Sequence, residues 1–289
     1  MKRQLSGRER ERNLVHIGFV APAVLLFLVI YIIPFIQGIP YSFTNWNGVG
    51  KDFDFIGIKN YITLLTNVEF RKVLGNTFYF TFFYLILSNA FGLIFALMLY
   101  RNSRFNGFVR SIFFIPFVVA LLTTAFIFRY LYTDVYSVLF NLPSPLGISS
   151  QAMMGIVFNA VWRDAGYCMI IYIAALQTVP VEYYEAASID GAGPVKRFLH
   201  ITVPAIMPAF TANITLILAW GLKLFDYPMA ATSGGPGSAT MSIAMYVYNN
   251  MFSYMKAGYG QAGAILMTLI MVILSTSLNK FLRSKEVES

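Results

Sequence analysis

Charge and cysteine are both scarce in this sequence, and each scarcity excludes a class of protein. Only 12% of the 289 residues are charged, against about 25% in a typical soluble domain. With 57% hydrophobic residues, the chain cannot cover a soluble surface with polar groups, so we expect a protein embedded in a lipid bilayer. One cysteine, Cys168, excludes an internal disulfide, and with only His16 and His200 beside it we expect no metal site. Cys168 is expected to be a small core residue.

The excess of positive charge, with 21 Lys and Arg against 13 Asp and Glu, does not point to nucleic acid. A nucleic-acid-binding protein gathers basic residues on a polar face among aromatic ones. Here they stand mainly at the ends of apolar runs, which is typical of segments that flank a membrane. We therefore expect lipid, and no nucleic acid, as a partner.

Apolar stretches long enough to cross a bilayer recur along the chain. A hydrocarbon core about 30 Å thick needs about 20 apolar residues in a helix. Six segments meet this requirement, at approximately residues 14–38, 73–100, 111–128, 152–178, 204–227 and 257–279. We predict an all-α polytopic membrane protein with six transmembrane helices. Its transmembrane domain would cover residues 14–282, between a basic segment, 1–13, and a tail, 283–289. The first run is too long for a cleaved signal peptide, so we expect it to be retained.

The distribution of Lys and Arg predicts the orientation of the chain. If the N-terminus lies inside, the inner side holds Lys2, Arg3, Arg8, Arg10, Arg12, Arg101, Arg104, Arg110, Lys196, Arg197, Lys280, Arg283 and Lys285. The outer side then holds only Lys51, Lys59, Arg71, Lys72, Arg129 and Lys256. Because Lys and Arg favour cytoplasmic loops, we expect both termini, and the loop 179–203, in the cytoplasm.

The loop 179–203 is predicted to form two short helices joined by a glycine bend. Pro180 suits a first helical turn, and Glu182 favours the positive end of the helix dipole. Gly191 ends this helix near residue 190. Pro194 then begins a second helix, which runs until Pro204 opens the fifth span.

One side of the first loop helix combines carboxylates with a small residue. Glu182, Glu185 and Ala186 fall together by three- and four-residue spacing. Such a knob suits a groove in a partner protein. The alternative is an interfacial amphipathic helix with a solvated charged face.

Polar residues inside the spans are candidates for a solute pathway, because charges in a membrane are costly and usually face a watery cavity. Arg163 and Asp164 are sequence neighbours, so they point about 100° apart and are expected not to pair. Lys223 and Asp226 are three residues apart and can pair, or can reach the interface by snorkelling. The full set is Asn89, Asn159, Trp162, Arg163, Asp164, Asn213, Trp220, Lys223, Asp226 and Tyr227. Helix packing is the alternative role for any one of them.

The stretch "ATSGGPGSAT", residues 231–240, is predicted to be an outer loop. Its Gly234, Gly235 and Pro236 favour a turn whose flexible backbone can approach another protein closely. An ordinary turn is the alternative.

The stretch "EAASIDGAGPVKRFLHITVP", residues 185–204, resembles the signature loop of permease subunits of binding-protein-dependent ABC importers. Residues that match in type and spacing are Glu185, Ala186, Ala187, Gly191, Ile201 and Pro204, whereas Val203 stands where Leu is usual. "FFIPFVVALLTTAFIFRYLY", "VWRDAGYCMIIYIAALQTVP" and "ATSGGPGSAT" resemble the carbohydrate branch, the maltose and multiple-sugar permeases. One departure is "TDVYSVLFNLPSPLGISS", which lacks the Gly-x-x-Asn turn of that branch.

The resemblance implies a subunit of the inner membrane of a prokaryote that pairs with a second, homologous permease. Two ATP-binding subunits and an extracytoplasmic solute-binding protein would complete the importer. ATP and Mg would then be bound by partner subunits, and this chain would bind no cofactor and have no catalytic residues. The coupling loop would include Glu182, Glu185, Ala186, Ala187, Asp190, Gly191 and Pro204. Glu185 would meet a basic residue of the ATPase, and the loop with Gly234, Gly235 and Pro236 would face the binding protein. The implied solute is a sugar, an oligosaccharide above all.

Other functions remain as alternatives. An ion-coupled secondary transporter would use Asp164 or Asp226 to carry protons or sodium, but the sequence shows no inverted repeat. Arg163 and Lys223 would also serve a sugar phosphate or glycerol phosphate ester. An intramembrane enzyme would need a nucleophile and a base, and no such pair stands out. The segment "NWNGVGKD" is not a phosphate-binding loop, because Asn45 and Asp52 replace its first Gly and final Ser or Thr.

Overall fold

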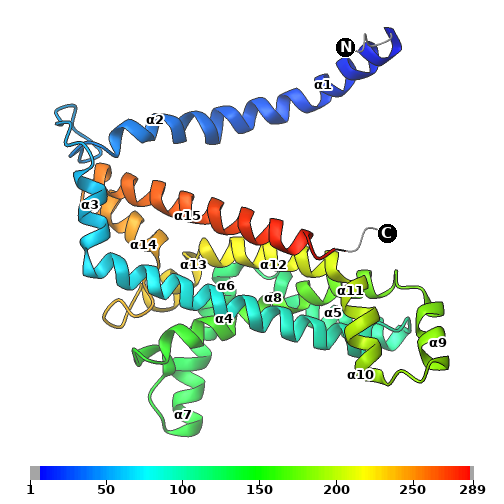
Figure 1. The fold of residues 1–289 in the computed structure, drawn as a ribbon. Coiled ribbons are helices and arrows are strands. Elements are labelled where there is room, and N and C mark those ends of the chain that lie inside the picture. Colours follow the sequence, from blue (N-terminus) through cyan, green and yellow to red (C-terminus); the bar gives the residue numbers. More distant parts are fainter. Residues whose placement is uncertain (1–6, 287–289) are drawn as a thin grey trace. The chain divides into compact units, whose positions relative to one another are not determined.

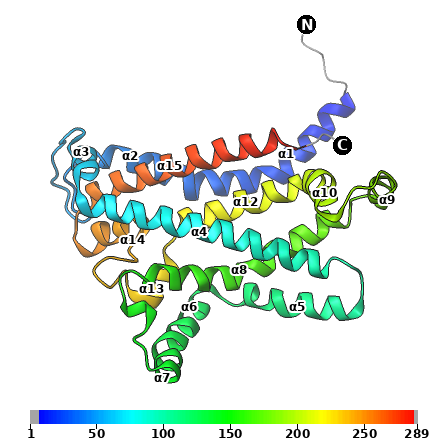
Figure 2. The same ribbon diagram turned by 60° about the horizontal axis from the view of Figure 1, so that its bottom comes forward.

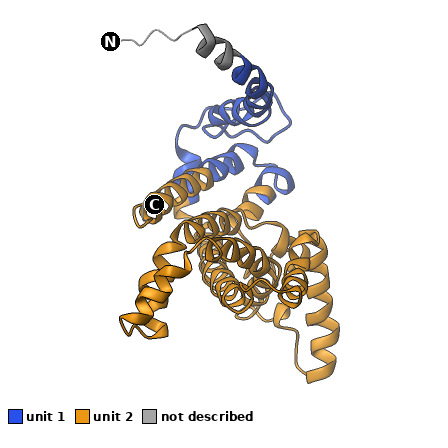
Figure 3. Cartoon of the chain, turned by 90° about the vertical axis from the view of Figure 1, so that its right-hand side faces the viewer, with its two compact units in different colours: residues 1–64, 249–265 blue, residues 65–248, 266–289 orange. Residues whose placement is uncertain are grey.

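The computed structural model describes residues 7–286, with side chains from residue 15 onward. Lys2, Arg3 and the end of the predicted tail, 287–289, lie outside the described residues. The described chain is helical, apart from loops and one antiparallel bridge between Thr44 and Phe55. It divides into two compact units, residues 1–64 with 249–265, and residues 65–248 with 266–289 (Figure 3).

The first unit contains a long apolar helix and the loop 42–58. Helix α1 (Gly7–Phe27), a π-helical turn (Leu28–Ile32) and α2 (Ile33–Tyr41) follow one another, and Val15–Tyr41 is long and apolar enough to span a membrane. Helix α3 (Lys59–Thr66) holds the loop 42–58, because the amide of Asn60 donates to the carbonyls of Ser42 and Thr44 at 2.8 and 2.9 Å. The unit also contains a π-helical turn (Asn249–Ser253) and the beginning of α15 (Ala257–Arg283).

The second unit is built on three packed helices, α4 (Val68–Leu99), α8 (Ala152–Leu176) and α12 (Met207–Leu222) (Figures 1 and 2). Small residues allow their close approach. A Cβ added to Gly92 of α4 would lie 2.5 Å from the Cβ of Cys168, and one added to Gly166 of α8 would collide with the backbone of Phe113 in α5 (Arg104–Val118). Cys168 is fully buried at this contact, as predicted for a core residue.

The predicted span 111–128 is not one continuous helix, because the chain breaks in its middle. Helix α5 ends at Val118. Helix α6 (Leu121–Tyr130) continues through a π-helical turn (Leu131–Tyr136) into α7 (Ser137–Phe140), and the segment Leu121–Phe140 is bent by 95° from α5. Val119 and Ala120 between them are extended, with ψ of 136°.

The fifth span is also bent, and the predicted bounds 204–227 are wrong at both ends. Helix α10 (Pro194–Arg197), a π-helical turn (Phe198–Thr202) and α11 (Val203–Ala205) form one arm, which meets α12 at 67°. Pro204 therefore lies inside the first arm and does not open the span. Helix α12 ends at Leu222, and Tyr227 belongs to a separate helix, α13 (Asp226–Thr232).

The predicted helix, bend and helix between the fourth and fifth spans are confirmed. Helix α9 covers Val181–Ile189, Gly191 has φ of +73°, and α10 begins at Pro194. Within the second unit, α9 and α10 lie at the end opposite α13 and α14 (Ile243–Tyr248) (Figures 1 and 2). Four described helices are long and apolar enough to be spans, and counting each bent pair as one gives six.

Candidate functional site

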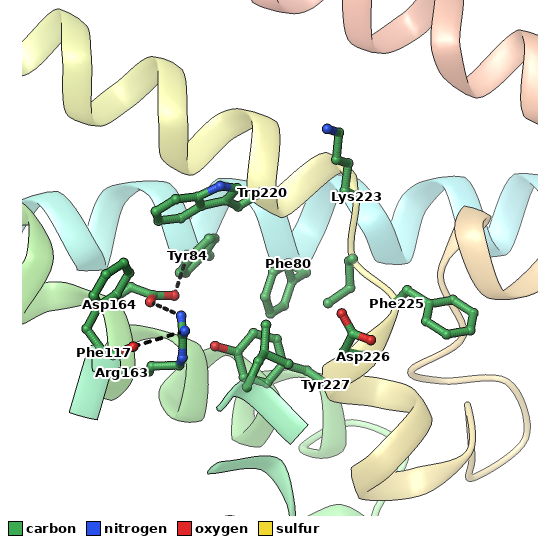
Figure 4. A pocket seen from close by; sticks show the side chains of 12 residues that line it. Phe80, Tyr84, Phe117, Arg163, Asp164, Trp220, Lys223, Phe225, Asp226 and Tyr227 are labelled. Carbon is green, nitrogen blue, oxygen red and sulfur yellow. Dashed lines mark hydrogen bonds and ion pairs between the residues drawn. The ribbon is translucent and has the colours of Figure 1, made fainter. Parts of the chain in front are cut away.

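A cavity of about 290 Å³ opens within the second unit, where the two broken helices meet α4 and α8. Its walls come from four stretches of the sequence (Figure 4): Phe80, Tyr84, Phe117, Leu121, Arg163, Asp164, Trp220, Lys223, Leu224, Phe225, Asp226 and Tyr227. Six of the residues predicted to form a solute pathway meet here, namely Arg163, Asp164, Trp220, Lys223, Asp226 and Tyr227.

Arg163 and Asp164 form an ion pair, contrary to the prediction that they point apart. Nη1 of Arg163 lies 2.6 Å from Oδ1 of Asp164, and the two side chains are 15% and 2% exposed. The arginine side chain is long enough to reach a carboxylate on the next residue, so the angle between the two Cβ atoms does not decide the contact. The hydroxyl of Tyr84 on α4 donates to the other carboxylate oxygen at 2.5 Å.

Arg163 also closes the break between α5 and α6. Its Nη2 donates to the carbonyl of Phe117 at 3.1 Å, and its Nε donates to that of Val119 at 3.4 Å. The last carbonyls of a helix have no partner within the helix, so a cation at this end satisfies and stabilises them. The guanidinium carbon also lies 4.9 Å from the centre of the Phe117 ring. One side chain thus supports the bend from which the cavity wall is built.

Lys223 and Asp226 do not share a helix. Helix α12 ends before Lys223, and α13 begins at Asp226. Within residues 15–286 no ion pair joins them, and Figure 4 shows the Lys223 ammonium directed away from the carboxylate. Both side chains are exposed. The cavity is therefore lined by two basic and two acidic residues. Arg163 and Asp164 form an ion pair, whereas Lys223 and Asp226 do not.

Aromatic rings form much of the remaining wall. Phe117 and Trp220 stack with ring centres 6.1 Å apart, and Trp220 is 36% exposed. Tyr227 is 6% exposed, and its buried hydroxyl has no hydrogen-bond partner among the described residues. Figure 4 shows this hydroxyl directed toward Arg163. The wall thus offers stacking surfaces together with an unused polar group.

Four residues predicted for the pathway lie outside the cavity. Asn89 accepts from the hydroxyl of Tyr172 at 2.6 Å, and Asn213 donates to the carbonyl of Cys168 at 3.2 Å, so these amides join packed helices. Asn159 is 2% exposed on α8. Trp162 is 46% exposed and lines a separate, apolar cavity beside α5. Packing is the role that the contacts of Asn89 and Asn213 support.

The cavity residues that the sequence did not single out are Phe80, Tyr84, Phe117, Leu121, Leu224 and Phe225. Aromatic and aliphatic residues in an apolar helix carry no signal of their own. Tyr84 was the one open to prediction, since a buried tyrosine hydroxyl in a span needs a partner.

The loop 233–242, which includes most of the stretch predicted to be an outer loop, is internally bonded, whereas its composition predicted a flexible turn. The hydroxyl of Thr240 donates to the carbonyl of Gly235 at 2.8 Å, and its amide donates to that of Gly234 at 3.2 Å. Gly234 has φ of +86°, which glycine adopts without strain. The peptide bond between Gly235 and Pro236 is cis.

Helix α9 presents its acidic residues to solvent and is braced from behind. Glu182, Glu185, Ala186 and Asp190 are exposed, whereas Ala187 is half-buried. Behind them the hydroxyl of Tyr184 lies 3.0 Å from that of Thr202, and Arg197 donates to the hydroxyl of Ser188 at 2.7 Å. Both contacts tie α9 to the segment beyond the glycine bend.

Among the described residues, no three His, Cys, Asp or Glu side chains are grouped as metal ligands.

Residues 88–285 match a family described as the inner membrane component of binding-protein-dependent transport systems. The chain is similar to a probable starch degradation products transport system permease protein, AmyD, of Thermoanaerobacterium thermosulfurigenes, with 34% identity over 93% of this chain and 94% of that protein. It is also similar to the multiple sugar-binding transport system permease protein MsmF of Streptococcus mutans, with 32% identity over 93% and 95%. In fold it is similar to a chain of a bacterial ABC transporter involved in the import of the acidic polysaccharide alginate. That match has a TM-score of 0.80 and 19% identity, and covers 96% of this chain and 98% of the other.

Proposed function

This chain belongs to the family of inner membrane components of binding-protein-dependent transport systems, and on that premise we propose that it carries an uncharged sugar, an oligosaccharide, through the cavity around Trp220. As a member it is a multi-pass permease subunit of an ABC importer in the inner membrane. Permease subunits of this family do not hydrolyse ATP, which is the work of the partner subunits.

The observation that carries the sugar proposal is the charge balance of the cavity wall. Asp164 and two backbone carbonyls already engage Arg163, so this guanidinium is not free for a phosphate. Lys223 shares the wall with Asp226, and the carboxylate of Asp226 repels an anion. A wall without net charge favours a neutral solute.

Stacking and hydrogen-bonding groups of the wall suit sugar rings. Trp220, which is 36% exposed and stacks with Phe117, offers an aromatic surface to the apolar face of a sugar, and the hydroxyl of Tyr227 adds a polar group to the same wall. AmyD and MsmF, both similar over nearly the whole chain, carry names that refer to starch products and to multiple sugars.

We further propose that α9 is the coupling helix and that the outer loop 233–242 faces the solute-binding protein. The two lie at opposite ends of the second unit (Figures 1 and 2), as a cytoplasmic and an extracytoplasmic contact require. Both termini would then be cytoplasmic. A second, homologous permease and two ATP-binding subunits complete the assembly. A braced helix transmits the movement of the ATPase as a rigid body, which a flexible loop would not.

The test of the solute site compares two tryptophans in the reconstituted importer. Transport of the sugar delivered by the binding protein is measured in proteoliposomes with ATP inside. We expect Trp220→Ala to lower the uptake rate about tenfold, since an aromatic stacking contact contributes on the order of 1 kcal/mol beyond the area it buries. Trp162→Ala, outside the cavity, should retain the rate of the unsubstituted importer.

Three outcomes would contradict the proposal. Equal loss in both variants would show that Trp220 acts through packing. Uptake of a sugar phosphate in preference to the free sugar would favour the phosphate ester, with Lys223 as its contact. Uptake that persists without ATP and collapses with the ion gradient would indicate a secondary transporter.

A further inference from the structure

Side chains of α4 hold the outer loop 233–242 from a distance of about 160 residues in sequence. The amide of Asn76 donates to the carbonyls of Ser238 and Met241 at 2.9 and 3.0 Å. The ammonium of Lys72, one turn earlier, donates to the carbonyl of Gly237 at 2.6 Å. Asn76 is half-buried and Lys72 is exposed. Water competes for the lysine, so the asparagine carries most of the restraint.

The loop needs such a restraint because its backbone is strained. Ser233, Gly234, Gly237 and Ser238 all have positive φ, and the two serines have values of +52° and +62°. A residue with a Cβ in this region costs on the order of 1 kcal/mol or more. Without Asn76, the two carbonyls it binds would lose that partner, and other conformations of the loop would become populated.

We propose that Asn76, with Lys72 in a smaller role, is a positioning residue that fixes loop 233–242 in the shape that docks the solute-binding protein. This inference rests on the proposed function of the loop. A preformed loop docks without an ordering cost, whereas a loop with several conformations must first be ordered, which weakens binding. Asn76 therefore affects the affinity for the binding protein and leaves the ATPase cycle itself untouched.

The chain offers a matched control on another loop. Asn60 of α3 makes the same contact, with its amide donating to the carbonyls of Ser42 and Thr44. The two asparagines hold different outer loops through the same bonds. Replacing either asparagine with alanine removes two hydrogen bonds to loop carbonyls. Asn76→Ala does so in the loop 233–242, which is proposed to dock, and Asn60→Ala does so in the loop 42–58, which is not.

The experiment measures ATP hydrolysis by the reconstituted importer against the concentration of solute-loaded binding protein. We expect Asn76→Ala to raise the half-maximal concentration about tenfold, on the order of the ordering cost of a loop. The maximal rate and the rate without binding protein should not change. Asn76→Asp has the same shape but no amide donor, so it should raise the half-maximal concentration at least as much. Asn60→Ala should leave the half-maximal concentration unchanged. Lys72→Met, at an exposed position, should shift about threefold.

Each contrary result has a distinct meaning. A half-maximal concentration unchanged in Asn76→Ala, or restored in Asn76→Asp, overturns the inference. An equal shift in Asn60→Ala also overturns it, because the effect would then be general destabilisation. If Asn76→Ala does not assemble, Lys72→Met becomes the test: a threefold rise in its half-maximal concentration supports the inference, and an unchanged value overturns it. An unsubstituted importer that does not respond to the binding protein at all would instead refute the proposed function.

Discussion

Arg163 and Asp164 contribute to the cavity mainly as support. Two charges are stable in a membrane interior only when they are paired and their remaining bonds are satisfied. Here Tyr84 binds the carboxylate, and two carbonyls at the break between α5 and α6 bind the guanidinium. The pair joins α4, α5 and α8 at one point. Its loss should therefore lower the stability of the protein more than it changes the choice of solute.

Asp164→Asn is therefore expected to destabilise the protein. It leaves a guanidinium that is 15% exposed without its counter-charge, and removing one partner of a buried pair costs about 3 kcal/mol or more. The melting temperature of the purified importer in detergent should fall by several degrees. Asp226→Asn, in the same cavity but exposed, should leave it unchanged. Equal melting temperatures of the two variants would show that the ion pair adds no stability.

At the scale of helices, α9 combines exposed carboxylates with a rigid mounting. We expect Glu185→Lys to uncouple the importer, because a reversed charge at the proposed ATPase contact repels the basic residue that the family resemblance implies there. Uptake and solute-stimulated ATP hydrolysis in proteoliposomes should both fall more than tenfold, since repulsion replaces attraction at a protein interface. Asp52→Lys, at an exposed position in the loop 42–58 and outside the proposed coupling loop, is the control for a change of charge alone. Intact activity of Glu185→Lys would show that α9 is not the coupling helix.

Helix packing depends on glycines whose surroundings differ sharply. A Cβ at Gly166 would collide with the backbone of Phe113, which cannot yield as a side chain can. A Cβ at Gly107, on α5, meets nothing within 4 Å. We expect Gly166→Ala to separate α5 from α8 and to lower folded yield and melting temperature. Gly107→Ala should match the unsubstituted protein or exceed it slightly, by up to about 1 kcal/mol of helix propensity. A folded, stable Gly166→Ala would contradict the packing described.

The sequence predicts the helices far better than their bends, for a physical reason. Apolar length places a span, and glycine with proline places the bend after α9, because both effects are local. Pro116 lies three residues before the break at Val119, but a proline inside an apolar run does not fix where the helix breaks, and the carbonyl at the break accepts from a guanidinium of α8 that lies 44 residues away. In the cavity, the polar residues stood out against apolar helices. Phe117 and Leu121 did not, since their role comes only from the break between them.

Across the whole molecule, the proposed contacts form a line through the second unit. The loop 233–242 directly follows α13, whose first residues, Asp226 and Tyr227, line the cavity. The hydroxyl of Ser242 at its far end donates to the carbonyl of Leu224, another wall residue. A binding protein on this loop would therefore act on the cavity wall through few intervening bonds, while α9 lies at the other end.

That line requires the predicted orientation of the spans, with the loops 42–58 and 233–242 on one side of the membrane and α9 on the other, and the single cysteine makes this orientation testable. Cys168→Ala removes only a buried thiol and leaves a chain without cysteine. Val49→Cys in the loop 42–58 and Val195→Cys in α10 then place thiols at matched positions, which are 74% and 72% exposed. Because Lys and Arg predict cytoplasmic termini, a membrane-impermeant maleimide should label Val49→Cys in intact protoplasts. It should label Val195→Cys only after permeabilisation. The reverse pattern would invert the orientation and remove α9 from the ATPase, whereas labelling of both in intact protoplasts would refute the span assignment between them.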